Sequence, residues 1–150
     1  ARGAACVFPF VYRGNTYHAY VCLSHITLSD PWRNVAFDLT SFSGYPKCDH
    51  GLAEDWYRFT GIGGDVLPES CVLSNRGGTD TPLWLNDSHP PLGVGVRGIN
   101  VCSTSQDKCC SGTFMMNVLA CPEGYYVYYL GQPSCSQSFK LQVLSPFTFW

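Results

Sequence analysis

Alternating aromatic and polar residues near the middle of the chain predict a strand of the core. In residues 55–61, Tyr57 and Phe59 fall on one side of an extended chain and polar side chains share the other, a period of two typical of a half-buried strand. The glycines that follow favour a sharp turn. Because Cys48 precedes this stretch and Cys71 follows it, we expect a core strand within a disulfide framework.

Other stretches rich in aromatic and β-branched residues predict further strands. They lie at 66–72, 94–101, 113–120, 124–130 and 138–144. Residues 6–21 predict a β-hairpin, because Gly14 and Asn15 accept the positive φ of a tight turn. Pro9 cannot donate to a strand ladder, so we expect its strand at an edge or with a bulge.

One segment has helical rather than strand spacing. Leu28, Trp32 and Val35 fall on one face of a helix, and Asp30-Pro31 favours a helix start there. The fold class predicted from these patterns is a mainly β, small, disulfide-rich domain with one short helix near 28–35 and an N-terminal β-hairpin. At 150 residues the chain is long enough to bury a substantial core.

Composition narrows the setting. Charged residues make up 13% of the chain and the formal net charge is −2, which argues against a nucleic-acid partner. No apolar run has the length of a membrane-spanning helix, so we expect no membrane insertion. The chain opens with Ala1, so we expect that a leader has been removed or that the numbering starts at a mature end.

The nine cysteines are the strongest compositional feature. In a Gly-, Pro- and aromatic-rich chain they indicate a secreted, extracellular protein with structural disulfides. Their spacing lacks the paired ligands of a zinc site, and we expect neither a metal nor a cofactor. The adjacent Cys109 and Cys110 favour two separate bonds, with a strained bond between the two as the alternative. Because nine is odd, one cysteine is free or pairs outside the chain.

The motifs of catalysis are absent from the sequence. Four histidines are present, and no serine stands in a nucleophile-elbow motif. His89 follows Asp87-Ser88 closely, but neighbours on a turn seldom converge, which favours a turn-capping role over a dyad. We therefore predict no catalytic residues and no enzyme.

One covalent modification is predicted. Asn86-Asp87-Ser88 is an N-glycosylation sequon on a polar loop, and the prolines after it favour exposure. The sequence thus predicts an N-linked glycan at Asn86.

From residue 22 to residue 135 the chain resembles the eight-cysteine (decoupling) module of uromodulin-type and zymogen-granule glycoproteins. The resemblance rests on ordered motifs: Cys22-x-x-His25-x-Thr27-Leu28, Trp32-Arg33, Cys48-Asp49, Trp56-Tyr57-Arg58-Phe59, Cys71-Val72, Trp84-Leu85-Asn86, His89-Pro90, Cys102, Cys109-Cys110, Cys121, Gly124-Tyr125-Tyr126-Val127-Tyr128 and Cys135. It implies about four disulfides among the eight cysteines of this region, in pairs that the sequence leaves open. The members are Cys22, Cys48, Cys71, Cys102, Cys109, Cys110, Cys121 and Cys135.

The flanking regions complete the predicted organisation. Residues 1–21 form an appendage whose hairpin resembles the first half of a fibronectin type II domain, without the half that would bind collagen. Residues 136–150 are a C-terminal strand and tail. Cys6 is then the unpaired or intermolecular cysteine. Two cysteines of the uromodulin module are missing here, where this chain has Gly77 and a residue near Lys140. The sequon that follows its tyrosine-rich strand is also missing.

These features and the resemblance together imply a non-catalytic, secreted glycoprotein module for extracellular adhesion, recognition or assembly. The alternative is a structural subunit of an extracellular filament or matrix that polymerises through the N-terminal hairpin, Cys6 or the aromatic tail. In both cases the expected partners are other extracellular proteins or copies of the chain itself.

Overall fold

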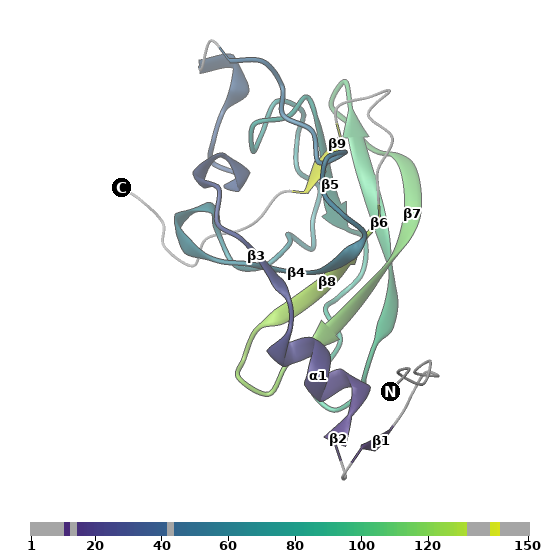
Figure 1. Ribbon diagram of the computed structural model, residues 1–150. Coiled ribbons are helices and arrows are strands. Elements are labelled where there is room, and N and C mark those ends of the chain that lie inside the picture. The colour runs from purple at the N-terminus through teal and green to yellow at the C-terminus, as the bar shows by residue number, and fades with distance from the viewer. Residues whose placement is uncertain (1–10, 13–14, 42–43, 132–138, 142–150) are drawn as a thin grey trace.

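A twisted seven-stranded sheet carries the fold (Figure 1). The structure is a computed structural model and describes residues 11–12, 15–41, 44–131 and 139–141. In spatial order the strands are β3 (Ile26–Leu28), β4 (Asp55–Phe59), β8 (Tyr126–Leu130), β7 (Lys108–Ala120), β6 (Arg97–Ser105), β5 (Thr81–Leu85) and β9 (Phe139–Leu141). The pairs β3–β4 and β5–β9 are parallel, and the other neighbours are antiparallel.

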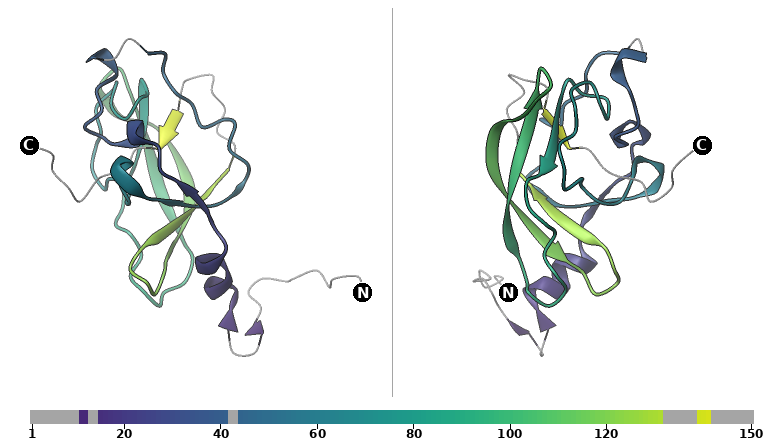
Figure 2. Two further views of the ribbon diagram at one scale, coloured as in Figure 1. Left: turned by 60° about the vertical axis from the view of Figure 1, so that its left-hand side comes forward. Right: turned by 180° about the vertical axis from the view of Figure 1, so that it is seen from behind.

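A second, two-stranded sheet lies at one end of the molecule. It pairs β1 (Val11–Tyr12) with β2 (Asn15–Thr16) in antiparallel fashion. The chain then enters α1 (Tyr17–Leu23), which connects the small sheet to β3. All views place β1, β2 and α1 at the same end, with the two short strands farthest from the large sheet (Figures 1 and 2).

The large sheet is buried mainly on one face. Its central cluster combines aromatic and aliphatic side chains from five strands with Leu67 of the segment that covers them, and Tyr128 and Leu67 are completely buried. On the other face two smaller clusters form. One packs Val21 and Cys22 of α1 against Trp56, and the other surrounds Trp84.

The long hairpin of β6 and β7 turns tightly. Gln106 and Asp107 at its tip both have positive φ, the backbone of a type I′ turn, which matches the twist of the two strands. The Asp107 carboxylate accepts the Ser74 N–H at 3.0 Å, and the Ser74 hydroxyl accepts the Asp107 N–H at 3.0 Å. The tip of the hairpin is thereby attached to the loop before β5.

The predicted fold class is confirmed, although the α-helix lies elsewhere. The region near 28–35 forms only the 3-10 turn η1 (Pro31–Arg33), which ends because Asn34 is extended. The α-helix is α1, so the second strand of the predicted hairpin stops at Thr16. Helical backbone here brings the adjacent Val21 and Cys22 together into the core, which strand alternation would have directed to opposite faces.

The strand predictions differ from the structure in three places. Strands do form within 55–61, and β6, β7, β8 and β9 overlap the stretches predicted near them. No strand forms over 66–72, where the Leu67 N–H donates to the Tyr128 hydroxyl and the Pro68 carbonyl accepts from Leu85. The sequence patterns missed β3 and β5. The remaining 3-10 turns are η2 (Leu39–Ser41) and η3 (Gly61–Gly63).

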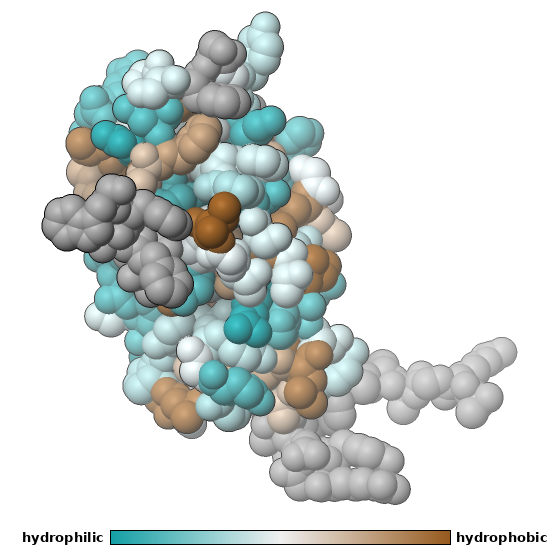
Figure 3. All heavy atoms as spheres, turned by 90° about the vertical axis from the view of Figure 1, so that its left-hand side faces the viewer, coloured by the Kyte–Doolittle hydropathy of each residue, from teal (hydrophilic) through white to brown (hydrophobic). Residues whose placement is uncertain are grey.

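The surface offers scattered apolar side chains. On the face drawn in Figure 3, hydrophobic residues form separate spots among hydrophilic ones. Scattered apolar residues of this kind are normal on a protein surface. Among the described residues, none of the helices is both long and apolar enough to span a bilayer.

Candidate functional site

The predicted glycosylation sequon lies at the end of β5, where the chain leaves the sheet. Asn86, Asp87 and Ser88 are all exposed, although the five residues of β5 before them are buried. The Asn86 N–H donates to the Asn100 carbonyl at 2.8 Å and so extends the β5–β6 ladder by one residue. The acceptor asparagine therefore has a fixed backbone and an accessible side chain. Residues 86–96, which connect β5 to β6, are called the sequon loop below.

His89 anchors the other side of the sequon to the core. Its side chain is 7% exposed, against 46% for that of its partner Glu69. The His89 backbone N–H donates to Glu69 Oε1 at 2.7 Å, and the imidazole Nδ1 contacts the same oxygen. On its opposite edge, Nε2 lies 2.8 Å from the hydroxyl of Tyr128. The ring also stacks on Tyr126, with centroids 4.3 Å apart.

The hydrogen bonds of this group are consistent with one arrangement of protons. A carboxylate only accepts, so Nδ1 carries the proton that binds Glu69. In the neutral ring Nε2 then accepts the Tyr128 O–H. The Tyr128 oxygen in turn accepts the Leu67 N–H at 3.2 Å. We call Glu69, His89, Tyr128 and the Leu67 N–H the His89 network.

Electrostatics in the His89 network oppose its use in catalysis. The backbone N–H and the imidazole of His89 lower the pKa of Glu69. Burial raises the pKa of Tyr128 far above that of a free phenol, and the phenol is completely buried. A carboxylate, an imidazole and a hydroxyl in a row resemble a catalytic triad, but here the hydroxyl is neither ionisable nor within reach of a substrate. The network is a structural support for the sequon loop.

Three disulfides hold the framework around the sheet. Cys22 of α1 bonds Cys121, 99 residues later; Cys71 bonds Cys109; and Cys102 of β6 bonds Cys110 of β7. Cys48 is also disulfide-bonded. Cys6 and Cys135 lie outside the described residues, and the roles predicted for them stay predictions.

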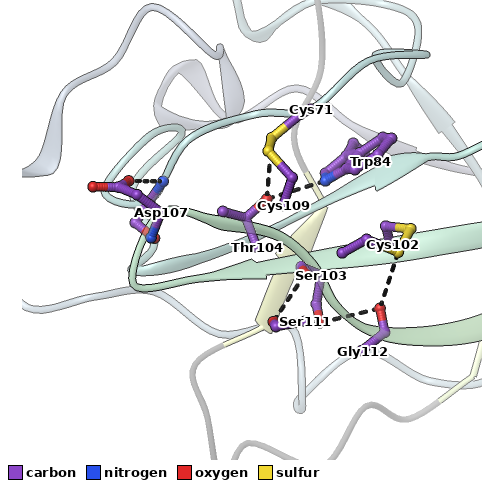
Figure 4. The surroundings of a disulfide bond; sticks show 11 residues. Cys71, Trp84, Cys102, Ser103, Thr104, Asp107, Cys109, Ser111 and Gly112 are labelled. Carbon is purple, nitrogen blue, oxygen red and sulfur yellow. Dashed lines mark hydrogen bonds between the residues drawn. A yellow bond between two sulfur atoms is a disulfide. The ribbon is translucent and has the colours of Figure 1, made fainter.

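The adjacent Cys109 and Cys110 bond different partners. Cys109 is tied to the loop before β5, and Cys110, with φ of 57°, is tied across the hairpin to β6. Figure 4 shows the Cys71–Cys109 bond beside Thr104, whose hydroxyl oxygen accepts the Trp84 indole N–H at 3.0 Å. The two bonds therefore enclose the cluster around Trp84 from two sides.

The aromatic strand β4 contributes packing. Trp56, Tyr57 and Phe59 are buried, and Trp56 meets Tyr129 edge-on. The Arg58 guanidinium lies 3.7 Å from the centroid of the Tyr125 ring, a cation–π contact. Arg58 is thus occupied by an aromatic neighbour.

A buried ion pair supports the segment before β4. Arg33, 3% exposed, donates to both carboxylate oxygens of Asp49 at 2.7 and 3.1 Å and to Asp30 at 3.0 Å. Burial opposes the charge on Arg33, but the hydrogen bonds from the two aspartates outweigh it and raise its pKa. The pair connects η1 to the residue that follows Cys48. Among the described residues, no group of three His, Cys, Asp or Glu side chains is arranged to hold a metal ion.

Comparison with known proteins accounts for this cysteine framework. Residues 57–141 match the family model described as the uromodulin-like eight-cysteine domain. The chain belongs to this uromodulin-like family. It is 39% identical to mouse uromodulin over 119 residues, which are 79% of this chain and 18% of that protein. It is 38% identical to the human pancreatic secretory granule membrane major glycoprotein GP2 over 116 residues, or 77% of this chain and 21% of that protein.

The predicted resemblance is therefore confirmed. The chain spans about a fifth of the length of these relatives. The predicted secreted, extracellular setting is confirmed as well, since these homologues are secreted or extracellular proteins and the chain carries disulfides. The relatives' names describe a glycoprotein and no enzymatic activity.

Two features of this uromodulin-like domain were absent from the sequence reasoning. Glu69 and Tyr128 lie 20 and 39 positions from His89, so no local motif joins them. The Arg33–Asp49 pair spans 16 positions. The only signal was the presence of Arg33, Asp49, His89 and Tyr128 within the family motifs, which did not indicate that they would meet.

Proposed function

We propose that this uromodulin-like chain is a non-catalytic, secreted glycoprotein module that mediates extracellular adhesion, recognition or assembly and displays an N-linked glycan at Asn86. The observation that carries the proposal is the position of the sequon. Its three residues are exposed, while β5 before it and His89 after it are held to the core. A rigidly supported, accessible asparagine suits a glycan that is presented to a partner.

The disulfide framework supports the same proposal. Six cysteines of the proposed module (residues 22–135) form three bonds, and Cys48 is bonded too. We assign its partner as Cys135, the eighth cysteine of that module. Cys6 is then left over in the appendage of residues 1–21, while residues 136–150 follow the module. Bonds of this kind contribute roughly 2–5 kcal/mol each, which suits a domain exposed outside the cell.

Absence of catalysis follows from the chemistry of His89. Its two nitrogens are engaged by Glu69 and by a buried phenol, so no nucleophile or free base faces solvent there. The glycoprotein name of the relative from the secretory granule membrane agrees with a display role.

The experiment is a binding assay with a matched pair of proteins. The chain is secreted from eukaryotic cells as the wild type and as Ser88→Ala, which removes the sequon but keeps Asn86. Both are tested against immobilised mannose-, galactose- and sialic-acid-binding lectins. The proposal predicts glycan on Asn86 and lectin capture of the wild type alone. Equal capture of both proteins, or an unmodified Asn86, would contradict it.

A second candidate function is self-polymerisation, and the N-terminal end of the structure favours it. The β1–β2 pair forms its own sheet, separate from the seven-stranded one, and so has open strand edges. In α1 beside it, Tyr20 and Leu23 are 61% and 80% exposed. Gel electrophoresis with and without reductant distinguishes the candidates, because a reducible ladder that disappears in Cys6→Ser supports polymerisation through Cys6. A monomer with one free thiol argues against that route.

A further inference from the structure

We propose that the glycan at Asn86 folds back on the protein, and that its first N-acetylglucosamine residues cover Met115 on the outward face of β6 and β7. This inference rests on the proposed glycosylation of Asn86. It assigns a carbohydrate-contact site to residues that have no other evident role.

The register of the strands aligns the three residues that define this site. Asn100 pairs with Met115 across β6 and β7, and the Asn86 N–H binds the Asn100 carbonyl. Asn86, Asn100 and Met115 therefore occupy one row across neighbouring strands. Residues paired in this way project from the same face of a sheet.

That face is the one turned away from the central core. The adjacent row contains Leu85 and Val101, both completely buried in the central cluster. Successive residues of a strand point to opposite faces, so the Asn86 row points outward. The Asn86 side chain and the Met115 side chain consequently leave the same surface.

Met115 is an exposed apolar residue in a polar surrounding. It is 61% exposed, and Asn100 and Asn117 beside it are exposed amides. Its methyl group occupies the space above Gly98, where an added Cβ would lie 2.8 Å from Met115 Cε. Gly98 thus provides a shallow seat for the methionine against the sheet.

The chemistry of this surface fits a sugar. N-acetylglucosamine has an apolar face of C–H groups that can cover a thioether, and its hydroxyl and acetamido groups can bind the two amides. Asn86 is two strands from Met115, a span of about 10 Å. The first two sugars of an N-glycan cover that span. The attachment point is fixed by β5 on one side and by the His89 network on the other, so the glycan leaves in a defined direction.

Peroxide oxidation provides the test, because the chain has two methionines and they are adjacent. Met115 is 61% exposed, whereas Met116 is 4% exposed on the other face and serves as an internal control for folding. The wild type, Ser88→Ala and wild type treated with peptide-N-glycosidase after folding are oxidised under the same conditions. Mass spectrometry measures both methionines and the occupancy of Asn86.

The proposal predicts that Met115 oxidises severalfold more slowly in the glycosylated protein than in either glycan-free form, with Met116 slow in all three. Equal Met115 rates with an occupied Asn86 would overturn this inference and leave glycan display intact. An unoccupied Asn86 would overturn both proposals. The enzyme-treated sample keeps the test valid if Ser88→Ala folds poorly, since its glycan is removed only after folding.

Discussion

The imidazole Nε2 of His89 lies 2.8 Å from the hydroxyl of Tyr128, a residue 39 positions later in the chain. This hydrogen bond joins the residue directly after the sequon to the centre of the buried sheet. It explains how an exposed three-residue sequon can have a stable position. It also makes the stability of the core and the presentation of Asn86 depend on the same contact.

Replacement of His89 by alanine is expected to destabilise the protein by about 1–3 kcal/mol, because the buried Tyr128 hydroxyl loses its acceptor. Denaturant unfolding without reductant measures the loss. The paired control is Tyr128→Phe, alone and combined with His89→Ala. The double variant should lose less than the sum of the single losses, since both remove one hydrogen bond. Strict additivity would show that the two residues act independently.

Glu69 predicts a dependence of stability on pH. Its pKa in the folded protein is lowered by the backbone N–H and the imidazole of His89, relative to the ordinary value of 4.5. A lowered carboxyl pKa stabilises the fold fully above the unfolded-state value, and this contribution is lost as the pH falls through the folded-state value. The difference in unfolding free energy between wild type and Glu69→Gln should therefore narrow as the pH falls below about 4.5.

The control for this titration is Glu123→Gln, at an exposed position in the turn before β8. Unfolding midpoints of the three proteins are compared from neutral to acidic pH. A difference between wild type and Glu69→Gln that stays constant over the whole range would refute the role assigned to the Glu69 carboxylate.

Gly63 and Gly51 form a matched pair that tests the packing of the turn after β4. A Cβ at Gly63 would lie 2.3 Å from the Asp30 carbonyl oxygen, whereas a Cβ at Gly51 would have no neighbour within 4 Å. Because the obstacle at Gly63 is backbone, Gly63→Ala should cost about 1–3 kcal/mol. Gly51→Ala should change the free energy of unfolding by less than about 0.5 kcal/mol. Equal thermal midpoints would disprove the close approach of η3 to residue 30.

The disulfides should contribute unequally. The Cys22–Cys121 bond closes a separation of 99 residues and the Cys102–Cys110 bond one of 8. Loop-closure entropy predicts losses of about 4–5 kcal/mol for Cys22→Ala/Cys121→Ala and about 2–3 kcal/mol for Cys102→Ala/Cys110→Ala. Unfolding of each double variant measures the loss, and the reverse order would rule out loop closure as the main cause.

Local patterns predicted the elements whose residues interact with a single buried face. The aromatic alternation in β4 and the tyrosine-rich β8 gave strands where the structure has them. β5 was missed because Pro82 resembles loop punctuation. In the structure Pro82 precedes the residues paired with β6, so its missing N–H costs that ladder nothing. The helix was misplaced because burial of Val21 and Cys22 depends on Trp56 and other distant residues.

The sequence identified the sequon and the cysteine framework but could not identify what supports them. Disulfide pairing depends on which strands become neighbours, and no local pattern links Cys22 to Cys121. His89 was expected to cap a turn. Its contacts with Glu69 and Tyr128 appear only when the loop before β5, the sequon loop and β8 come together.

Peptide mapping of the native secreted protein by mass spectrometry, without reduction, tests the central claim most directly. The claim is a disulfide-bonded module that holds a glycosylated Asn86. The account predicts linked peptides for Cys22–Cys121, Cys71–Cys109 and Cys102–Cys110, and an N-glycan on Asn86. Different pairing of these six cysteines, or an unmodified Asn86, would contradict it.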